Sequence, residues 1–163
     1  AAYSHTAWSD NTAENRICPE NGMHSGFLNI ETTLVNKTMI FATGIDIIEI
    51  DRIKRSLQKY SDRFEQRVFT QKEIGYCHSQ ADPAKHFAAR FSVKEAVLKC
   101  FGTGLTGGIL WKDIEVDKQK SGQPVLNLYG KGKELFDQLK LKSIHISITH
   151  EKNYAVAHAI AEK

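Results

Sequence analysis

Residues 90–99 read RFSVKEAVLK, and this stretch decides the fold. It lies inside the longest helix that the sequence predicts, about residues 84–100. Asp82 and Pro83 introduce this helix, and four closely spaced glycines after residue 101 end it. Its apolar positions predict a buried face, which includes Phe87, Phe91, Val97 and Leu98. We therefore expect this helix to pack into the core.

The charged residues of this helix form two stripes, because residues four apart share a helix face. Arg90 and Lys94 form one stripe, and Glu95 and Lys99 form the other. A solvated ion pair between Glu95 and Lys99 would explain the second stripe. A functional explanation is also open, because magnesium often takes only one or two protein carboxylates and a lysine can bind the adjacent phosphate.

A second acidic residue lies upstream, in the predicted strand at residues 40–47. This strand reads IFATGIDI and places Asp46 among β-branched side chains. Burying an ionised carboxylate is costly unless something compensates its charge. An exposed strand face would explain Asp46, and so would a bound metal ion. With Glu95 and the neighbouring bases, Asp46 indicates a divalent metal next to a phosphate-bearing substrate.

The remaining pattern predicts an α+β fold without internal repeats, because one strand and a block of helices precede several strands. Further helices are expected at residues 51–59, from residue 61, from the capping box at residues 70–73, and at residues 131–139. Further strands are expected at residues 113–117, 125–129, 143–150 and 154–160.

Composition narrows the class of protein. The 163 residues are 41% hydrophobic and 25% charged, which suits one globular domain. No apolar run reaches the roughly 20 residues of a membrane span. The net charge of +3 is too small to indicate nucleic acid, but it suits an anionic substrate or an acidic partner. Cys18, Cys77 and Cys100 have no zinc-site spacing, so we expect reduced thiols in a cytoplasmic protein.

Residues 1–38 differ from the rest of the chain. Polar side chains dominate there, no period persists, and no secretory signal is present. Met39 immediately precedes the first predicted strand and would be a natural start. We therefore expect residues 1–38 to be a poorly ordered or artificially added extension, and residues 39–163 to form the functional domain. A regulatory or targeting arm is the alternative.

Two further features could belong to a phosphate site. The Gly102-Thr103-Gly104 turn follows the long helix, where its glycines could let backbone amides approach a ligand or could simply end the helix. His150 ends an alternating strand, where a structural role and a binding role are both open. His145 and His158 lie in alternating strands without a motif, and we expect them to be structural.

Together these segments resemble the bacterial holo-[acyl-carrier-protein] synthases, the small class of 4′-phosphopantetheinyl transferases. The resemblance covers Met39 to about Glu162 and rests on three motifs in the family's order. Residues 44–53 resemble the opening strand and first helix, residues 90–104 the central signature, and residues 147–150 the C-terminal strand motif.

The resemblance implies transfer of the 4′-phosphopantetheine arm of coenzyme A to a serine of apo acyl carrier protein, with release of adenosine 3′,5′-bisphosphate. Asp46 and Glu95 match the family's Mg²⁺ ligands, and Lys99 matches the lysine near the phosphates, so Glu95 and Lys99 would be catalytic. Coenzyme-binding positions are matched by Lys99, Gly102, Thr103, Gly104 and His150. Either Glu95 or a water on the metal would take the serine proton.

The resemblance also implies a small α+β domain whose antiparallel sheet packs with helices and which assembles into a homotrimer. Its active sites would lie at subunit interfaces, and its role would be in fatty acid biosynthesis. Arg52 matches an arginine that meets the acidic carrier protein, and Arg63 and Arg67 fall in the same basic region. Exposed arginines would raise the association rate more than the affinity.

Two other functions remain open on sequence alone. One is a non-catalytic carrier-protein or nucleotide-binding module that has kept the fold. The other is a different magnesium-dependent phosphotransferase that uses a nucleotide. The presence of Asp46, Glu95 and Lys99 argues against the non-catalytic module, and transfer from labelled coenzyme A would separate all three possibilities.

Overall fold

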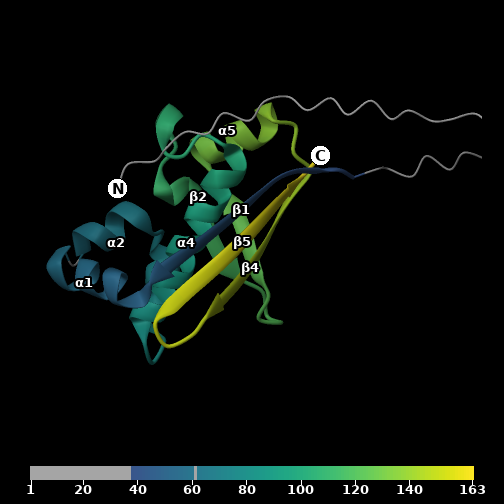
Figure 1. The fold of residues 1–163 in the computed structure, drawn as a ribbon. Helices are drawn as coiled ribbons and strands as arrows, with labels where there is room; N and C mark the ends of the chain where they lie inside the picture. Colours follow the sequence, from purple (N-terminus) through teal and green to yellow (C-terminus); the bar gives the residue numbers. More distant parts are fainter. Residues whose placement is uncertain (1–37, 61) are drawn as a thin grey trace, which may run out of the picture. The chain divides into compact units, whose positions relative to one another are not determined.

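One long helix runs through the middle of the fold in the computed structural model, which describes residues 38–60 and 62–163 (Figure 1). Helix α4 (Pro83–Phe101) ends at Gly102, whose φ of 72° lets its amide donate to the carbonyls of Leu98 and Lys99. Thirteen of the nineteen residues of α4 are buried. A helix that is buried on most sides forms the centre of a fold.

A three-stranded antiparallel sheet covers one side of α4 in the order β1-β5-β4. The strands are β1 (Ile40–Glu49), β5 (Tyr154–Glu162) and β4 (Ser143–His150). The residues of the central strand that face the helix are all alanines, and none is more than 1% exposed: Ala155, Ala157, Ala159 and Ala161. Their small side chains leave room for α4 directly over the sheet.

Gly44 permits the same close approach on β1. A Cβ atom at Gly44 would lie 2.0 Å from the backbone oxygen of Ala96 on α4, so a larger residue would force the strand and the helix apart. Asp46 lies two residues further on and therefore faces the same side of the sheet. Gly44 thus brings the Asp46 carboxylate up against helix α4.

The other side of α4 packs against helices and a second, two-stranded sheet. The helices are α1 (Ile50–Tyr60), α2 (Asp62–Val68) and α3 (Gln71–His78). The second sheet pairs β2 (Ile114–Lys118) with β3 (Pro124–Leu128), and α5 (Gly130–Gln138) follows it. Two clusters of core side chains result, and residues of α4 belong to both.

The expected α+β class and the element boundaries agree with the structure to within two residues. The capping box is present: the Glu73 amide donates to Thr70 Oγ1 at 3.3 Å, and the Thr70 amide donates to Glu73 Oε2 at 2.9 Å. The strand expected from residue 113 is wrong at its first position. Asp113 closes a 3₁₀ turn instead, because its carboxylate accepts from the Leu110 amide at 3.0 Å.

Two further expectations concern the N-terminal extension and a possible membrane-spanning helix. The extension expected at residues 1–38 lies outside the described residues except for Thr38. In the part of the chain that the structure describes, no helix combines the length and apolar character needed to cross a membrane.

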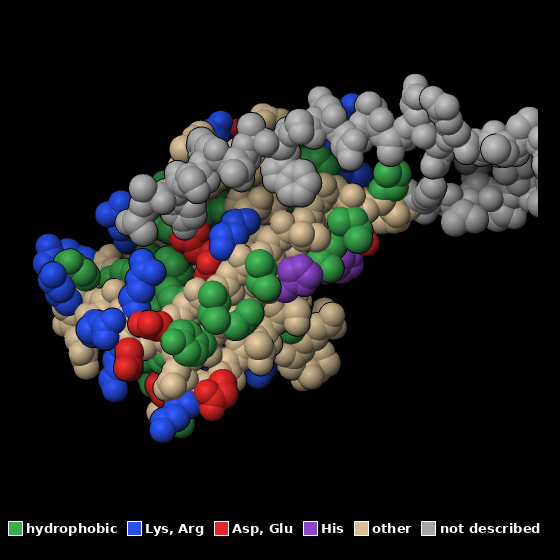
Figure 2. Space-filling model, in the orientation of Figure 1, with side chains coloured by type: hydrophobic (Ala, Val, Ile, Leu, Met, Phe, Trp, Pro, Cys, Tyr) green, Lys and Arg blue, Asp and Glu red, His purple; other side chains and the backbone are tan. Residues whose placement is uncertain are grey.

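The face of the β1-β5-β4 sheet that points away from α4, which we call the outer sheet face, carries exposed apolar side chains. Ile45 is 62% exposed and Ile47 is 63% exposed, and Phe41 and Tyr154 are also exposed. Figure 2 shows hydrophobic side chains on the side of the molecule where β1 and β5 lie in Figure 1. Nothing within residues 38–60 and 62–163 covers this face.

Candidate active site on two flanks of helix α4

Asp46 and Lys99 form an ion pair between β1 and α4. Lys99 Nζ donates to Asp46 Oδ1 at 2.9 Å and to the backbone oxygen of Ile45 at 2.6 Å. The Asp46 side chain is 15% exposed, so its interpretation as an ordinary exposed strand residue is wrong. An intrahelical ion pair between Glu95 and Lys99 is also wrong, because the ammonium of Lys99 turns to Asp46 instead.

Glu95 lies half-buried on the same flank of α4 as Lys99. Burial raises the pKa of Glu95 and the negative charge of Asp46 raises it further, while Lys99 and Arg52 oppose the shift. The structure therefore brings together Asp46, Glu95 and Lys99, as the sequence predicted. Two carboxylates that repel each other in a partly buried place are stabilised by a cation between them.

This donor set fits magnesium. Both available ligands are carboxylate oxygens, which hard cations such as magnesium prefer. Among the residues that the structure describes, no cluster of three or more His, Cys, Asp or Glu side chains is arranged to hold a metal. Two protein carboxylates are sufficient for magnesium when water and substrate phosphate complete its coordination. The Asp46–Glu95 pair therefore suits a metal ion that is shared with a phosphate.

Arg52 joins this flank to a surface rich in positive charge. Its guanidinium is close enough to Glu95 to lower the pKa of that carboxylate. Figure 2 shows Lys and Arg side chains gathered over α1 and α2. We call this the basic surface, and its exposed members are Arg52, Lys54, Arg55, Lys59, Arg63 and Arg67. All three arginines predicted to meet a carrier protein lie on it.

The Gly102-Thr103-Gly104 turn begins three residues after Lys99, at the C-terminal end of α4. It folds back on itself, because the Thr106 amide donates to the carbonyl oxygen of Thr103 at 3.2 Å. No hydrogen bond among the described residues links this turn to Asp46 or Glu95. Its role in coenzyme binding stays a prediction.

His150 lies in a different place from Asp46. Its ring centroid is 5.5 Å from that of His86, and both histidines line a pocket of about 200 Å³ with Arg90. On α4, His86 lies nine residues before Glu95, and Arg90 lies nine residues before Lys99. Nine residues are about two and a half helical turns, so each residue lies on the opposite side of the helix from its counterpart. Glu95 and Lys99 therefore lie on one flank of the helix, and His86 and Arg90 lie on the opposite flank. One copy of the chain does not bring His150 to the two carboxylates.

The pocket around His150 is suited to an anion. The guanidinium of Arg90 stacks 4.0 Å from the ring centroid of Tyr76, and the buried Nε of Arg90 has no hydrogen-bond partner among the described residues. Such orphaned polar atoms are rare in protein interiors. Burial lowers the pKa of His86, and the charges of His150 and Arg90 lower it further, so the pocket disfavours added positive charge. The i, i+4 spacing of His86 and Arg90 was the sequence signal that could have identified this second flank.

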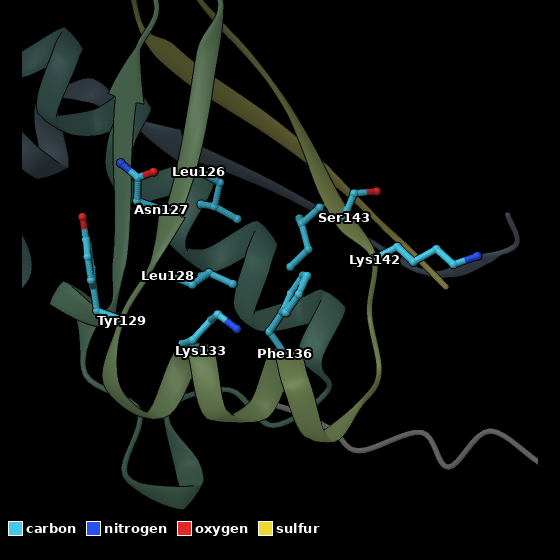
Figure 3. Close-up of a pocket in the computed structure, with 9 residues that line it drawn as sticks. Leu126, Asn127, Leu128, Tyr129, Lys133, Phe136, Lys142 and Ser143 are labelled. Atoms are coloured by element: carbon cyan, nitrogen blue, oxygen red, sulfur yellow. The ribbon is translucent and has the colours of Figure 1, made fainter.

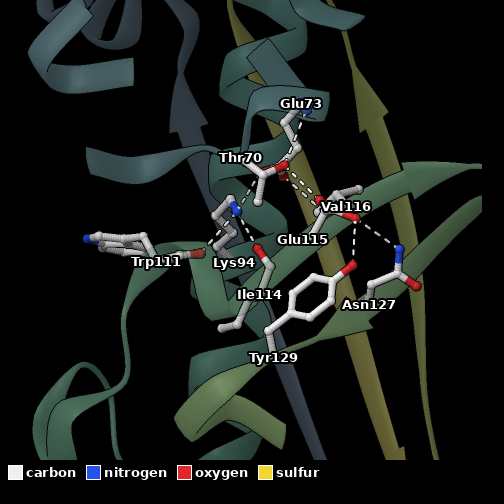
Figure 4. A network of polar contacts seen from close by, with 9 residues as sticks. All are labelled: Thr70, Glu73, Lys94, Trp111, Ile114, Glu115, Val116, Asn127 and Tyr129. Atoms are coloured by element: carbon white, nitrogen blue, oxygen red, sulfur yellow. Dashed lines mark hydrogen bonds and ion pairs between the residues drawn. The ribbon is translucent and has the colours of Figure 1, made fainter. Parts of the chain in front are cut away.

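Lys94 shares a helix stripe with Arg90, but it lies inside the core. Its side chain is fully buried, and its Nζ donates to Glu73 Oε2 at 2.9 Å, to the Trp111 carbonyl at 3.1 Å and to the Ile114 carbonyl (Figure 4). An ammonium group has three donors, and all three are used. Lys94 therefore holds α4 to α3 and β2 and has no donor left for a substrate.

A larger groove of about 440 Å³ lies between β3, α5 and β4, and none of the predicted site residues lines it (Figure 3). Leu126, Leu128 and Phe136 point into the groove, whereas Asn127 and Tyr129 point away from it. These last two donate to Glu115 at 3.1 and 3.2 Å. The grouping of Asp46, Glu95 and Lys99 therefore identifies the candidate site, and the larger groove does not.

Comparison with known proteins identifies the family of the chain. A family model described as the 4′-phosphopantetheinyl transferase superfamily matches residues 42–159. The chain is 44% identical over 124 residues to the holo-[acyl-carrier-protein] synthase of Koribacter versatilis, an alignment that covers 76% of this chain and 99% of that protein.

Solved structures give the same relationship. The holo-[acyl-carrier-protein] synthase of Neisseria meningitidis matches with a TM-score of 0.72 and 27% identity, covering 77% of this chain and 100% of that one. The Bacillus anthracis synthase in complex with CoA (3′,5′-ADP) matches with a TM-score of 0.64 and 33% identity, covering 77% and 98%. The chain therefore belongs to the 4′-phosphopantetheinyl transferase superfamily and, within it, to the holo-[acyl-carrier-protein] synthases.

Proposed function

We propose that this chain transfers the 4′-phosphopantetheine arm of coenzyme A to a serine hydroxyl of apo acyl carrier protein and releases adenosine 3′,5′-bisphosphate. The observation that carries the proposal is the group of Asp46, Glu95 and Lys99 next to the basic surface of α1 and α2. The relatives named for this activity and the B. anthracis complex with CoA support it.

The first flank of α4, which carries Glu95 and Lys99 and faces Asp46, supplies residues with complementary roles in this reaction. The serine oxygen attacks the phosphorus that carries the pantetheine arm, and the bond from this phosphorus to the oxygen of the leaving nucleotide breaks. The serine proton goes to the Glu95 carboxylate or to solvent beside it. Lys99, whose side chain is 40% exposed, can turn from Asp46 to a phosphate oxygen. Magnesium held by Asp46 and Glu95 would neutralise charge on the pyrophosphate.

The pocket of the second flank would hold the nucleotide end of the coenzyme. Its phosphate would meet His150 and Arg90, whose Nε has no partner among the described residues. Lys118 also lines this pocket and adds positive charge. The Gly102-Thr103-Gly104 turn would bind nearer the pyrophosphate, because it directly follows the helical turn that carries Lys99.

Because the two flanks lie on opposite sides of α4, a coenzyme that uses both must lie between two copies of the chain. We propose a homotrimer in which Asp46 of one copy faces His150 of its neighbour. Such a head-to-tail interface closes into a ring of three when successive copies are related by a rotation of about 120°. The exposed apolar outer sheet face supports assembly, since apolar patches of this kind commonly mark interfaces.

The activity is tested by incubating the chain with coenzyme A, magnesium and apo acyl carrier protein and measuring the mass of the carrier. We expect a mass gain of one phosphopantetheine on the carrier serine. Asp46→Asn should abolish the gain, whereas Asp137→Asn on the exposed surface of α5 should preserve it. An unchanged rate in Asp46→Asn would refute the metal assignment, and binding of coenzyme A without transfer would favour the non-catalytic module.

The shared site is tested by mixing two inactive variants, Asp46→Asn and His150→Ala, under conditions that allow subunits to exchange. If each site takes one flank from each of two copies, about a quarter of the sites in a one-to-one mixture contain both intact flanks. Activity should therefore return to about a quarter of the wild-type level. No recovery despite confirmed exchange would show that each copy carries a complete site.

We also propose that residues 39–163 contain the whole transferase domain. The aligned 124 residues already cover 99% of the K. versatilis synthase. A chain that begins at Met39 should retain the transfer rate of the full chain, and a large loss would assign residues 1–38 a role in the reaction.

A further inference from the structure

The outer sheet face carries an unpaired histidine at its centre. His158 is exposed on the middle strand β5, where its register partners are Ile45 on β1 and Ser147 on β4. In Figure 2, histidine side chains lie next to hydrophobic ones on this side of the molecule. No hydrogen bond, ion pair or ring contact with another described residue involves the His158 side chain. A positive charge on His158 would therefore have no compensating partner among the described residues of its own copy.

His145, on the neighbouring strand β4, provides a natural contrast. It is also exposed, but its Nε2 lies 2.9 Å from Glu162 Oε2 and 3.1 Å from Ser143 Oγ. The hydrogen bonds from His145 and Ser143 lower the pKa of Glu162, which keeps this carboxylate ionised next to the ring. A proton on His145 is thus compensated by Glu162 of the same copy, whereas no described residue compensates a proton on His158.

The groups that face His158 explain why its charge would decide whether copies associate. Its neighbours on the adjacent strands do not titrate: Thr43, Ile45 and Ile47 on β1, and Ser147 and Thr149 on β4. His145 is the diagonal neighbour and has its own carboxylate. The other titratable groups lie toward the ends of the face: Glu49 of β1, and Tyr154 and Glu162 of β5. No carboxylate of this face is therefore next to His158.

We propose that the outer sheet face is a pH-gated contact between copies of this chain, which forms only while His158 is neutral. The proposal rests on the assembly proposed above. Burying an imidazolium ion in an apolar contact without a counter-charge is strongly unfavourable. Rotational symmetry adds the same histidine from every copy to the contact, so the charges also repel one another. Histidine is the side chain that ordinarily changes its charge between pH 5 and 8.

The expected pH response is steep, because each copy must lose a proton before it can be buried. If three copies must each release one proton on association, the association constant falls by up to about a thousandfold for each unit by which the pH is lowered. The contact should therefore be stable at pH 8 and weak at pH 5.5. Acid would release folded single copies, whose active sites are incomplete if the site is shared.

The test is sedimentation velocity of the full chain at pH 8 and pH 5.5, at equal ionic strength and protein concentration, with circular dichroism to follow the fold. We expect trimers at pH 8 and folded monomers at pH 5.5. His158→Gln, which cannot become charged, should remain trimeric at both pH values. His158→Lys, which is charged throughout, should be monomeric at both. His145→Gln is the matched control on the same face and should keep the wild-type response.

Each failure has a separate meaning. A wild-type chain that is monomeric at pH 8 would overturn the proposed assembly and the gate with it. A wild-type chain that is trimeric at both pH values would leave the assembly intact and overturn the gate. A trimeric His158→Lys variant at pH 8 would also overturn the gate, and this comparison does not depend on the stability of the chain in acid.

Discussion

Helix α4 carries two lysines that each pair with a carboxylate of another element, and the two pairs have different surroundings in the fold. Lys94 pairs with Glu73 at 2.9 Å, and both side chains are 0% exposed. Lys99 pairs with Asp46 at the same 2.9 Å, but Lys99 is 40% exposed and Asp46 is 15% exposed. The distance between the charged atoms therefore does not distinguish the two pairs, and burial does.

The two pairs also differ in how fully their polar atoms are used. Glu73 accepts from Lys94, from the Thr70 amide and from the Val116 amide at 3.0 Å, so its pair is closed to further ligands (Figure 4). Asp46 repels Glu95 and shares an exposed lysine with solvent. A satisfied network rigidifies a core. A network whose charges are only partly compensated leaves a carboxylate available to a metal ion and an ammonium group available to a phosphate.

The largest effect on stability is expected from breaking the buried pair. Lys94→Met leaves the Glu73 carboxylate buried without its counter-charge, and such a change costs about 3–5 kcal/mol of unfolding free energy. Denaturant titration followed by circular dichroism measures this cost. The double variant Glu73→Leu/Lys94→Met removes both charges and should recover much of the loss. A single variant as stable as the wild type would show that the pair does not hold α4 in place.

The next largest effect is expected from the open pair, in the rate of transfer rather than in stability. Lys99→Met removes a positive charge from the proposed phosphate site and should lower kcat by about a hundredfold or more. Its ion pair is partly exposed, so the unfolding free energy should change by less than about 1 kcal/mol. A Lys99→Met variant that keeps its rate and loses its stability would reverse the roles that the structure indicates for the two lysines.

The contrast between the pairs shows which parts of the site were predictable from sequence. Glu95 and Lys99 share a helix face by their spacing alone, and the isoleucines around Asp46 indicated a carboxylate that needs compensation. Local patterns of this kind also predicted most of the fold. The role of Lys94 was not predictable, because its partners Glu73 and the carbonyl of Ile114 are 21 and 20 residues away along the chain.

The ring contact between His86 and His150 was not predictable for the same reason, although His150 itself was predicted and the spacing of His86 and Arg90 was visible in the sequence. His86 and His150 lie on α4 and β4, and only the packing of helix on sheet brings their rings to 5.5 Å. No local pattern marks such a contact, because the intervening chain folds into β2, β3 and α5 before it returns. The sequence could name His150 and Asp46 as candidate site residues, but it could not show that they lie on opposite flanks of α4.

The smallest effect concerns Glu115, which extends the buried network through Thr70. Burial raises the pKa of Glu115, but hydrogen bonds from Asn127, Thr70 and Tyr129 outweigh it, and the pKa lies below its ordinary value of 4.5. The unfolded chain therefore binds this proton more tightly than the folded chain does. The unfolding free energy should fall as the pH drops through 4.5 and should stop falling from this cause below the folded pKa.

Glu115→Gln removes this titration and should flatten the acid limb of the stability curve, measured by urea unfolding between pH 3 and pH 6. Asp117 is the matched control on the same strand: its pKa is also lowered, chiefly by the hydrogen bond from exposed Lys72, but it lies outside the buried network. Asp117→Asn should therefore change the acid limb less, because exposed pairs contribute little to stability. An equal flattening in both variants would mean that the buried network confers no special stability and that burial does not separate structural from functional charges on this scaffold.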